Sequence, residues 1–169
     1  MPAYFKHAPD IGLTIADLVA PCFVFAIGLT ATDAWRRRLA RAGRQKTFEH
    51  VLERGMALIG IGVLFSQGES HYGYTHEIGQ WGTLQAIGTA VLLSAPTLLL
   101  KSWHRLGAAL ALVGFYHYLV QAFWLKTVVA SSRAGIQGSL SWTALLMLST
   151  VFADLYRDRQ DNQTSMRSY

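Results

Sequence analysis

The chain contains very little cysteine and none of the common motifs of soluble enzymes. Cys22 is the single cysteine among 169 residues, so an internal disulfide bond is excluded. Neither a glycine-rich phosphate-binding loop nor a Ser-His-Asp pattern can be recognised. The apolar segments do not alternate with a period of two residues, which argues against a membrane β-barrel. These absences leave a helical protein, in which we expect Cys22 to be a small core residue.

Acidic residues are scarce as well, and the basic excess needs an explanation. The chain has 15 Lys and Arg against 10 Asp and Glu, which gives a formal net charge of +5 at pH 7. A basic excess of this kind is typical of nucleic-acid-binding proteins. However, 51% of the residues are hydrophobic, and they lie in long runs between short polar loops. Runs of this kind are typical of transmembrane helices, since a bilayer core requires about 20 helical residues. We therefore expect an integral membrane protein that contacts the lipid bilayer and does not bind nucleic acid.

The hydrophobic runs predict an all-α fold, a polytopic membrane helix bundle with about five transmembrane helices. The predicted spans are Leu13–Trp35, Val51–Ser66, Thr83–Leu100, Leu106–Leu125 and Ser139–Tyr156. The second span carries Gly55, Gly60 and Gly62, which allow close backbone approach and favour a packed inner helix. Residues 1–156 form the predicted membrane domain. Residues 157–169 lack apolar periodicity and are expected to be a disordered cytoplasmic tail.

The placement of the basic residues predicts the topology. Arginine and lysine crowd residues 36–46, between the first two spans, and recur at Lys101, at Arg105 and after the last span. With five crossings these regions share one side of the membrane, and positively charged loops face the cytoplasm. The N-terminus is therefore expected outside and the C-terminus in the cytoplasm, in an inner or plasma membrane. Because no secretory signal peptide is recognisable, the first span is expected to remain in the mature protein.

The N-terminal segment contains the best catalytic candidates. His7 lies in a polar stretch directly before an apolar run that retains a carboxylate, Asp17. A charge inside a membrane span costs about 2 kcal/mol or more, so a carboxylate at Asp17 requires a compensating interaction or a functional role. It either supports His7 or stabilises the N-terminus of a helix through the helix dipole. A histidine titrates near neutrality and acts as a general base or as a nucleophile. Asp33, beside the arginines, is expected to be paired or solvated.

The sequence YFKHAPDIGLTIADLVAPCFVFAIG runs from Tyr4 to Gly28. This stretch resembles the signature of the heparan-α-glucosaminide N-acetyltransferase family. The resemblance rests on its Tyr-Phe-Lys-His-Ala start, its Gly-Leu-Thr-x-Ala-Asp-Leu-Val run and its Phe-x-Phe ending. Members of that family are transmembrane acyltransferases. A shorter stretch, Gly82–Gly88, resembles a second helix start of the family, and Arg54 with Gly55 resembles a third. The resemblance covers about residues 4–100.

The resemblance implies an activity and a set of site residues. Family members move an acetyl group from cytoplasmic acetyl-CoA to an acceptor on the far side of the membrane, an amino sugar or glycan. On this resemblance His7 is the catalytic residue, as a base or a covalent acyl carrier, and Asp17 supports it. Arg54 and Gln85 would contact the donor. Acetyl-CoA is then a co-substrate, and no metal is expected.

The chain also departs from the family pattern. Residues 9–11 replace a Trp-Asn pair, and Ala86 stands where the family has an arginine. The family has an additional first helix and more spans, so the membrane domain is expected to be truncated. The chain is either an active acyltransferase or a non-catalytic, degenerate subunit or split half of one. A homodimer or a partner membrane subunit is expected to cover the open flank, through small-residue faces such as Gly107, Ala111 and Gly114.

Replacing His7 tests the catalytic assignment. His7→Ala should remove most acetyl transfer, since general-base catalysis contributes about 10²–10⁴-fold, and should leave the elution volume in detergent unchanged. Asp17→Asn should cost less, because an amide accepts a hydrogen bond but does not stabilise an imidazolium. Acetylation of an amino-sugar acceptor by reconstituted protein is the measurement. Full activity of His7→Ala would end the assignment.

Overall fold

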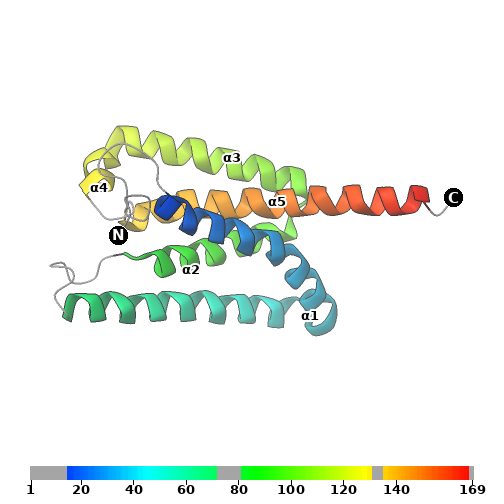
Figure 1. The fold of residues 1–169 in the computed structure, drawn as a ribbon, viewed down its shortest axis with the longest axis horizontal. Helices are drawn as coiled ribbons and strands as arrows, with labels where there is room; N and C mark the ends of the chain where they lie inside the picture. The colour runs from blue at the N-terminus through cyan, green and yellow to red at the C-terminus, as the bar shows by residue number, and fades with distance from the viewer. Residues whose placement is uncertain (1–14, 72–80, 131–134, 168–169) are drawn as a thin grey trace.

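The computed structural model describes residues 15–71, 81–130 and 135–167. Within these ranges the chain is helical and contains no β-strand, which confirms the predicted all-α class. The elements in chain order are α1 (Ile15–His71), α2 (Thr83–Ser94), the 3₁₀ helix η2 (Ala95–Leu99), α3 (Ser102–Leu119), the π-helical turn η3 (Val120–Trp124), α4 (Leu125–Ala130) and α5 (Gly135–Arg167). The helices run roughly along one axis and form an elongated bundle (Figure 1).

Helix α1 reverses its direction at Gly43 and forms a helical hairpin (Figure 1). Gly43 has φ 78° and ψ 175°, a backbone conformation that glycine adopts without steric cost. The Thr47 hydroxyl donates to the Gly43 carbonyl at 2.7 Å. The rings of Trp35 and Phe48 meet edge to face across the bend, with centroids 5.0 Å apart. The basic segment that the sequence places in a loop is therefore helical on both sides of a single non-helical residue.

Helix α5 lies at the centre of the bundle and packs against α1, α2 and α3. In α1 we distinguish a first leg, residues 15–42, and a second leg, residues 44–71. The buried apolar core is formed by Val24, Ile87, Ala90 and Leu146. Small hydroxyl side chains cover much of the core face of α5, and Ser149 and Thr150 donate to carbonyls one turn earlier at 2.7 and 2.6 Å. Small residues at such contacts let helices approach closely.

Three helical stretches of the described residues are long and apolar enough to cross a membrane: Leu18–Gln67, Ser102–Val128 and Gly135–Asp161. The first contains the bend at Gly43 and so comprises both legs of α1. A shorter apolar helix covers Thr83–Leu99. Each span predicted from the sequence overlaps one leg or one of these helices. The number of crossings stays a prediction.

Glycines bring the second leg of α1 and α2 into backbone contact. A Cβ placed on Gly88 would lie 2.7 Å from the Gly55 carbonyl oxygen, and one on Gly62 would lie 2.9 Å from the Gln85 side chain. Gly55 and Gly62 are buried, whereas Gly60 is exposed and a Cβ there would meet no atom within 4 Å. The close packing predicted for the second span is therefore confirmed at Gly55 and Gly62.

The structure corrects two expectations. Cys22 is exposed rather than buried in the core. Because the exterior of a membrane bundle is as apolar as its interior, hydropathy does not separate the two. The segment predicted as a disordered tail is helical as far as Arg167, and Gln160 donates to the Tyr156 hydroxyl one turn earlier at 3.1 Å. Residues 157–167 contain neither glycine nor proline, so no residue in them breaks the helix.

The small-residue face of α3 is open. Gly107, Ala111 and Gly114 are exposed, and a Cβ added to Gly107 or Gly114 would meet no atom within 4 Å. The homodimer or partner subunit that the sequence predicts for this flank stays a prediction.

Gly88→Ala should destabilise the bundle, because the added methyl group forces the backbones of α1 and α2 apart. We expect a loss of about 1–3 kcal/mol in the free energy of unfolding, as for other overpacked sites. Gly60→Ala is the matched control: it adds the same methyl group in open space and should be neutral or slightly stabilising. Unfolding titrations in mixed micelles measure both variants. Equal stability of the two would contradict the close approach at Gly88.

Candidate functional site

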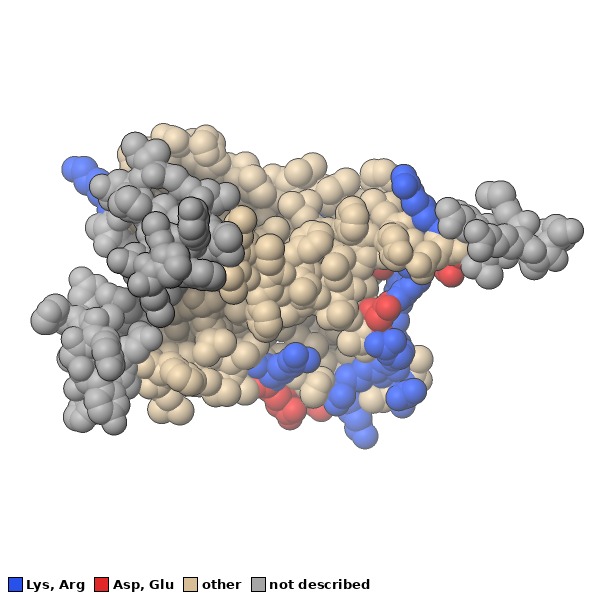
Figure 2. Space-filling view, in the orientation of Figure 1, with Lys and Arg blue, Asp and Glu red and all other residues tan. Residues whose placement is uncertain are grey.

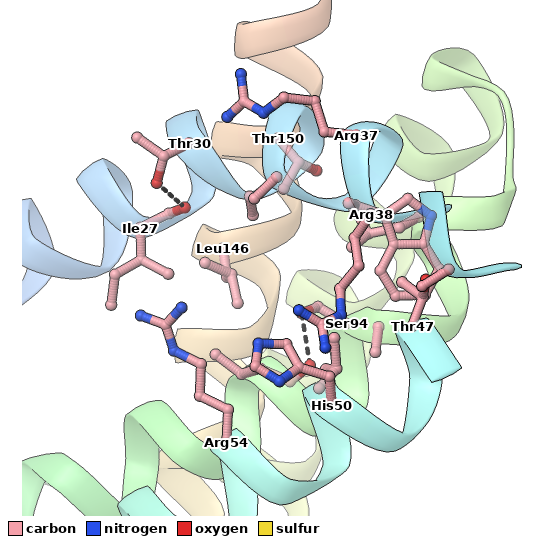
Figure 3. A pocket seen from close by; sticks show the side chains of 18 of the residues that line it. Ile27, Thr30, Arg37, Arg38, Thr47, His50, Arg54, Ser94, Leu146 and Thr150 are labelled. Carbon is pink, nitrogen blue, oxygen red and sulfur yellow. Dashed lines mark hydrogen bonds between the residues drawn. The ribbon is translucent and has the colours of Figure 1, made fainter. Parts of the chain in front are cut away.

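A cavity of about 530 Å³ opens at the bend of α1, and we call it the basic cavity. Both legs of α1, together with α2, η2 and α5, surround it (Figure 3). Its lining residues are Ile27, Thr30, Ala31, Ala34, Trp35, Arg37, Arg38, Arg41, Ala42, Thr47, His50, Val51, Arg54, Val91, Ser94, Ala95, Leu98, Leu146 and Thr150. Its volume lies within the range of small-molecule sites, about 300–1,000 Å³.

Basic side chains dominate one part of this cavity. Arg37, Arg38 and Arg41 come from the first leg of α1, and His50 and Arg54 come from the second leg. Figure 3 shows the side chains of Arg38, His50 and Arg54 turned toward the space between the legs. Figure 2 shows Lys and Arg gathered around the bend. Because the lining residues include no Asp or Glu, their positive charge favours an anion, and the arginine fork matches phosphate geometry.

The remainder of the lining is largely apolar. Ile27, Val91, Leu98 and Leu146 contribute aliphatic side chains from α1, α2, η2 and α5. Along the first leg, lining positions recur every three to four residues, so they share one helix face that changes from apolar at Ile27 to basic at the bend. The cavity therefore fits an amphipathic anion, with its charged groups at the arginines and an uncharged arm along the aliphatic side chains.

Asp154 of α5 connects three helices beside this cavity. Its side chain is 2% exposed and forms an ion pair with Arg105 of α3, which is 3% exposed. Arg36 of α1 donates to the same carboxylate at 2.9 Å, and the Ser102 hydroxyl donates to it at 3.0 Å. Since Arg36 is 53% exposed, its ion pair contributes less than the buried pair with Arg105. One carboxylate thus joins α1, α3 and α5.

The structure separates the two residues that the resemblance assigns to the donor. Arg54 lines the basic cavity, as a donor-binding role requires. Gln85 lies elsewhere, 2% exposed at the start of α2, where its Oε1 accepts a hydrogen bond from the Gly82 N–H at 2.6 Å. This bond satisfies a free N–H group at a helix N-terminus. A structural role therefore accounts for Gln85.

Of the two predicted catalytic residues, the structure describes the position of Asp17 alone. His7 lies outside the described residues. Asp17 lies in the first turn of α1, which begins at Ile15. From Asp17 to Arg38 the first leg rises about 32 Å, at 1.5 Å per residue. Asp17 and the arginines of the basic cavity are therefore at opposite ends of the first leg.

The comparison with known protein families identifies the family of this chain. The family model described as Heparan-alpha-glucosaminide N-acetyltransferase, catalytic, matches residues 4–159. The chain belongs to this family. The match continues beyond residue 100, where the resemblance seen in the sequence ends, and it covers every lining residue of the basic cavity. No curated protein and no solved structure matches the chain.

Membership in the heparan-α-glucosaminide N-acetyltransferase family indicates a membrane acetyltransferase-like function. Together with the apolar helices, it indicates an integral membrane protein. A match over nearly the whole chain does not favour the alternative of a non-catalytic subunit.

The sequence-based prediction overlooks two features of this N-acetyltransferase-family protein. His50 lies one helical turn before Arg54, and that spacing places both side chains on one helix face. Asp154 and Arg105 lie near the ends of predicted spans, where an ionisable residue needs a partner. The pairing of Asp33, by contrast, is confirmed, since this carboxylate forms an ion pair with Arg157.

Asp154→Asn should destabilise the protein strongly, because it leaves Arg105 buried without a counter-charge. We expect a loss of about 3 kcal/mol or more in the free energy of unfolding. Asp158→Asn is the control, since Asp158 is exposed and its replacement should change stability by less than about 0.5 kcal/mol. Thermal or denaturant unfolding in detergent measures both variants. A loss of similar size in the two would refute the importance of the buried pair.

Proposed function

We propose that the protein transfers an acetyl group from acetyl-CoA, bound in the basic cavity, to an amino-sugar or glycan acceptor at the opposite face of the membrane. The observation that carries the proposal is a cavity with four arginines and no carboxylate in a chain of the N-acetyltransferase family. Acetyl-CoA has phosphate groups at one end and a thioester at the end of a long arm. Its charge distribution matches that of the cavity.

The two legs of α1 would hold the phosphates together. Arg38 approaches from the first leg and Arg54 from the second, so one phosphate-bearing ligand contacts both sides of the bend (Figure 3). The bend at Gly43 fixes the distance between these legs. If positively charged segments face the cytoplasm, the cavity opens to the compartment that supplies acetyl-CoA.

The chemistry would take place at the other end of the first leg. The acceptor amine attacks the acetyl carbonyl, the C–S bond breaks and the thiolate of coenzyme A leaves. His7 takes the proton of the amine, or it first accepts the acetyl group and passes it on, while Asp17 stabilises the imidazolium. From Ile27, a lining residue of the cavity, to Asp17 the helix rises about 15 Å. The arm of the donor must cover this distance to hold the reacting groups together.

Acetyl-CoA binding to the purified protein tests the donor assignment. Arg38→Gln and Arg54→Gln should each weaken binding about tenfold, because each removes a charge-assisted hydrogen bond to phosphate. Titration calorimetry in an uncharged detergent is the measurement. Pantetheine, which lacks the phosphates, should not compete with acetyl-CoA.

Arg44→Gln provides the matched control for these variants. Arg44 is exposed near the bend and does not line the basic cavity, so the variant makes the same change of charge outside the site. Its affinity for acetyl-CoA should equal that of the wild type. If all three variants bind equally well, the basic cavity is not the donor site.

Cysteine labelling tests the sidedness on which the proposal depends. In a Cys22→Ser background, Lys126→Cys places a thiol at an exposed position in α4, and Arg44→Cys places one next to Gly43. Helix α4 and the bend of α1 lie at opposite ends of the bundle (Figure 1). A membrane-impermeant maleimide should label Lys126→Cys in intact cells, and Arg44→Cys only after permeabilisation. Equal labelling of both in intact cells would contradict the proposed orientation.

A further inference from the structure

A second cavity, of about 270 Å³, lies on the other side of Trp35, which lines both cavities. We call it the phosphate cavity. It lies between the first leg of α1, the segment from Leu98 to Arg105, and Asp154 of α5. Figure 1 places the start of α3 at the same end of the bundle as the bend of α1. The proposed binding of acetyl-CoA makes no use of this cavity.

Two buried polar groups that line the phosphate cavity have no partner among the described residues. They are the Thr32 hydroxyl and the Arg105 Nε, and each residue is 3% exposed. A buried donor without a partner costs free energy, and native proteins satisfy nearly all such groups with protein, water or a ligand. Two of them beside one cavity indicate that the cavity holds an acceptor.

The state of Thr32 differs from that of other helical threonines in the chain. Thr30, Thr47, Thr143 and Thr150 each donate to a carbonyl three or four residues earlier. This internal bond satisfies a hydroxyl without any ligand. Thr32 forms no such bond, although it lies in the same regular helix as Thr30. Its hydroxyl is therefore available to a group in the cavity.

The charge and the backbone around the cavity specify an anion. Arg36, Lys101 and Arg105 line it, against the single carboxylate of Asp154. Helix α3 begins at Ser102 after an N-cap, Lys101, whose side chain makes no capping bond. The first N–H groups of a helix lack partners inside the helix and attract negative charge. An anion in this cavity would meet this helix N-terminus together with lysine and arginine side chains.

We propose that the phosphate cavity binds a phosphate group, and that an anionic phospholipid supplies it. Basic pockets between membrane helices are typical sites for such headgroups. Helix α3, which contributes Ser102 and Arg105 to the cavity, also carries exposed apolar side chains, since Trp103 is 74% exposed and Leu110 is 57% exposed. This surface suits the acyl chains, since the same helix is apolar enough to lie in a bilayer. Free phosphate is the other source of the same chemistry.

Lipid retention by the full-length protein in uncharged detergent tests the proposal. Phosphatidylglycerol is added at increasing mole fraction, and native mass spectrometry measures the bound fraction. Phosphatidylcholine with the same acyl chains serves as the zwitterionic comparison. A separate titration with inorganic phosphate, followed by the thermal midpoint, tests free phosphate as the source.

The variants avoid the buried ion pair, whose loss we expect to destabilise the protein. Lys101→Gln should weaken phosphatidylglycerol binding about fivefold, because one positive charge is removed from the site. Thr32→Val, which preserves the side-chain shape, should weaken it by about as much through the lost hydroxyl. Arg44→Gln makes the same change of charge as Lys101→Gln outside the cavity and should have no effect.

Selective, saturable retention of phosphatidylglycerol with these variant effects supports the lipid as the source. Saturable stabilisation by inorganic phosphate alone, with the same variant effects, supports the phosphate site and assigns it to free phosphate. Equal retention of phosphatidylcholine without any response to phosphate would overturn the proposal. So would an equal loss of binding in Arg44→Gln and Lys101→Gln, because the attraction would then be non-specific.

Discussion

The buried ion pair of Asp154 with Arg105 is the interaction on which the basic end of the bundle depends. Removing two charges from water carries a large desolvation cost, so the pair persists only because further donors satisfy the carboxylate. Arg36 and Ser102 supply them. Asp154 therefore fixes α3 to α5 and to the first leg of α1. The phosphate cavity forms around this pair, and the basic cavity lies on the other side of Trp35.

The absence of carboxylates from the lining of the basic cavity explains how its arginines remain available to a ligand. Asp154 is occupied by Arg105 and Arg36, and Asp33 is occupied by Arg157. The basic cavity has no carboxylate of its own to neutralise its arginines. Close packing at glycines brings the second leg of α1 against α2 at Gly55, Gly62 and Gly88, and the first leg against α5 at Gly28. The positive charge of the cavity therefore remains available to a ligand.

Hydropathy predicts where the apolar helices lie, and the glycines of the second span predict its close packing, which is confirmed at Gly55 and Gly62. Hydropathy does not predict the reversal at Gly43, since a single positive φ leaves no hydrophobic signature. It also places Cys22 wrongly, because the apolar exterior and interior of a membrane bundle have the same composition. The family resemblance marks both Arg54, which lines the basic cavity, and Gln85, whose bond to Gly82 accounts for it structurally. A family motif contains residues that take part in the reaction and residues that stabilise the fold, so the motif alone does not separate the two.

The length of the first leg constrains any mechanism for this family member. Its polar end at the bend holds the arginines, while Asp17 lies in its first turn, about 32 Å of helix rise away. A donor held by its phosphates reaches the far end only if its arm lies along the helix face that carries Ile27. That face is aliphatic at Ile27, which packs against the core cluster containing Leu146, so in the proposed mechanism it would exclude water from the path of the thioester. A dry path would protect the thioester from hydrolysis, so in the proposed mechanism the apolar part of the cavity would be as necessary to transfer as its arginines.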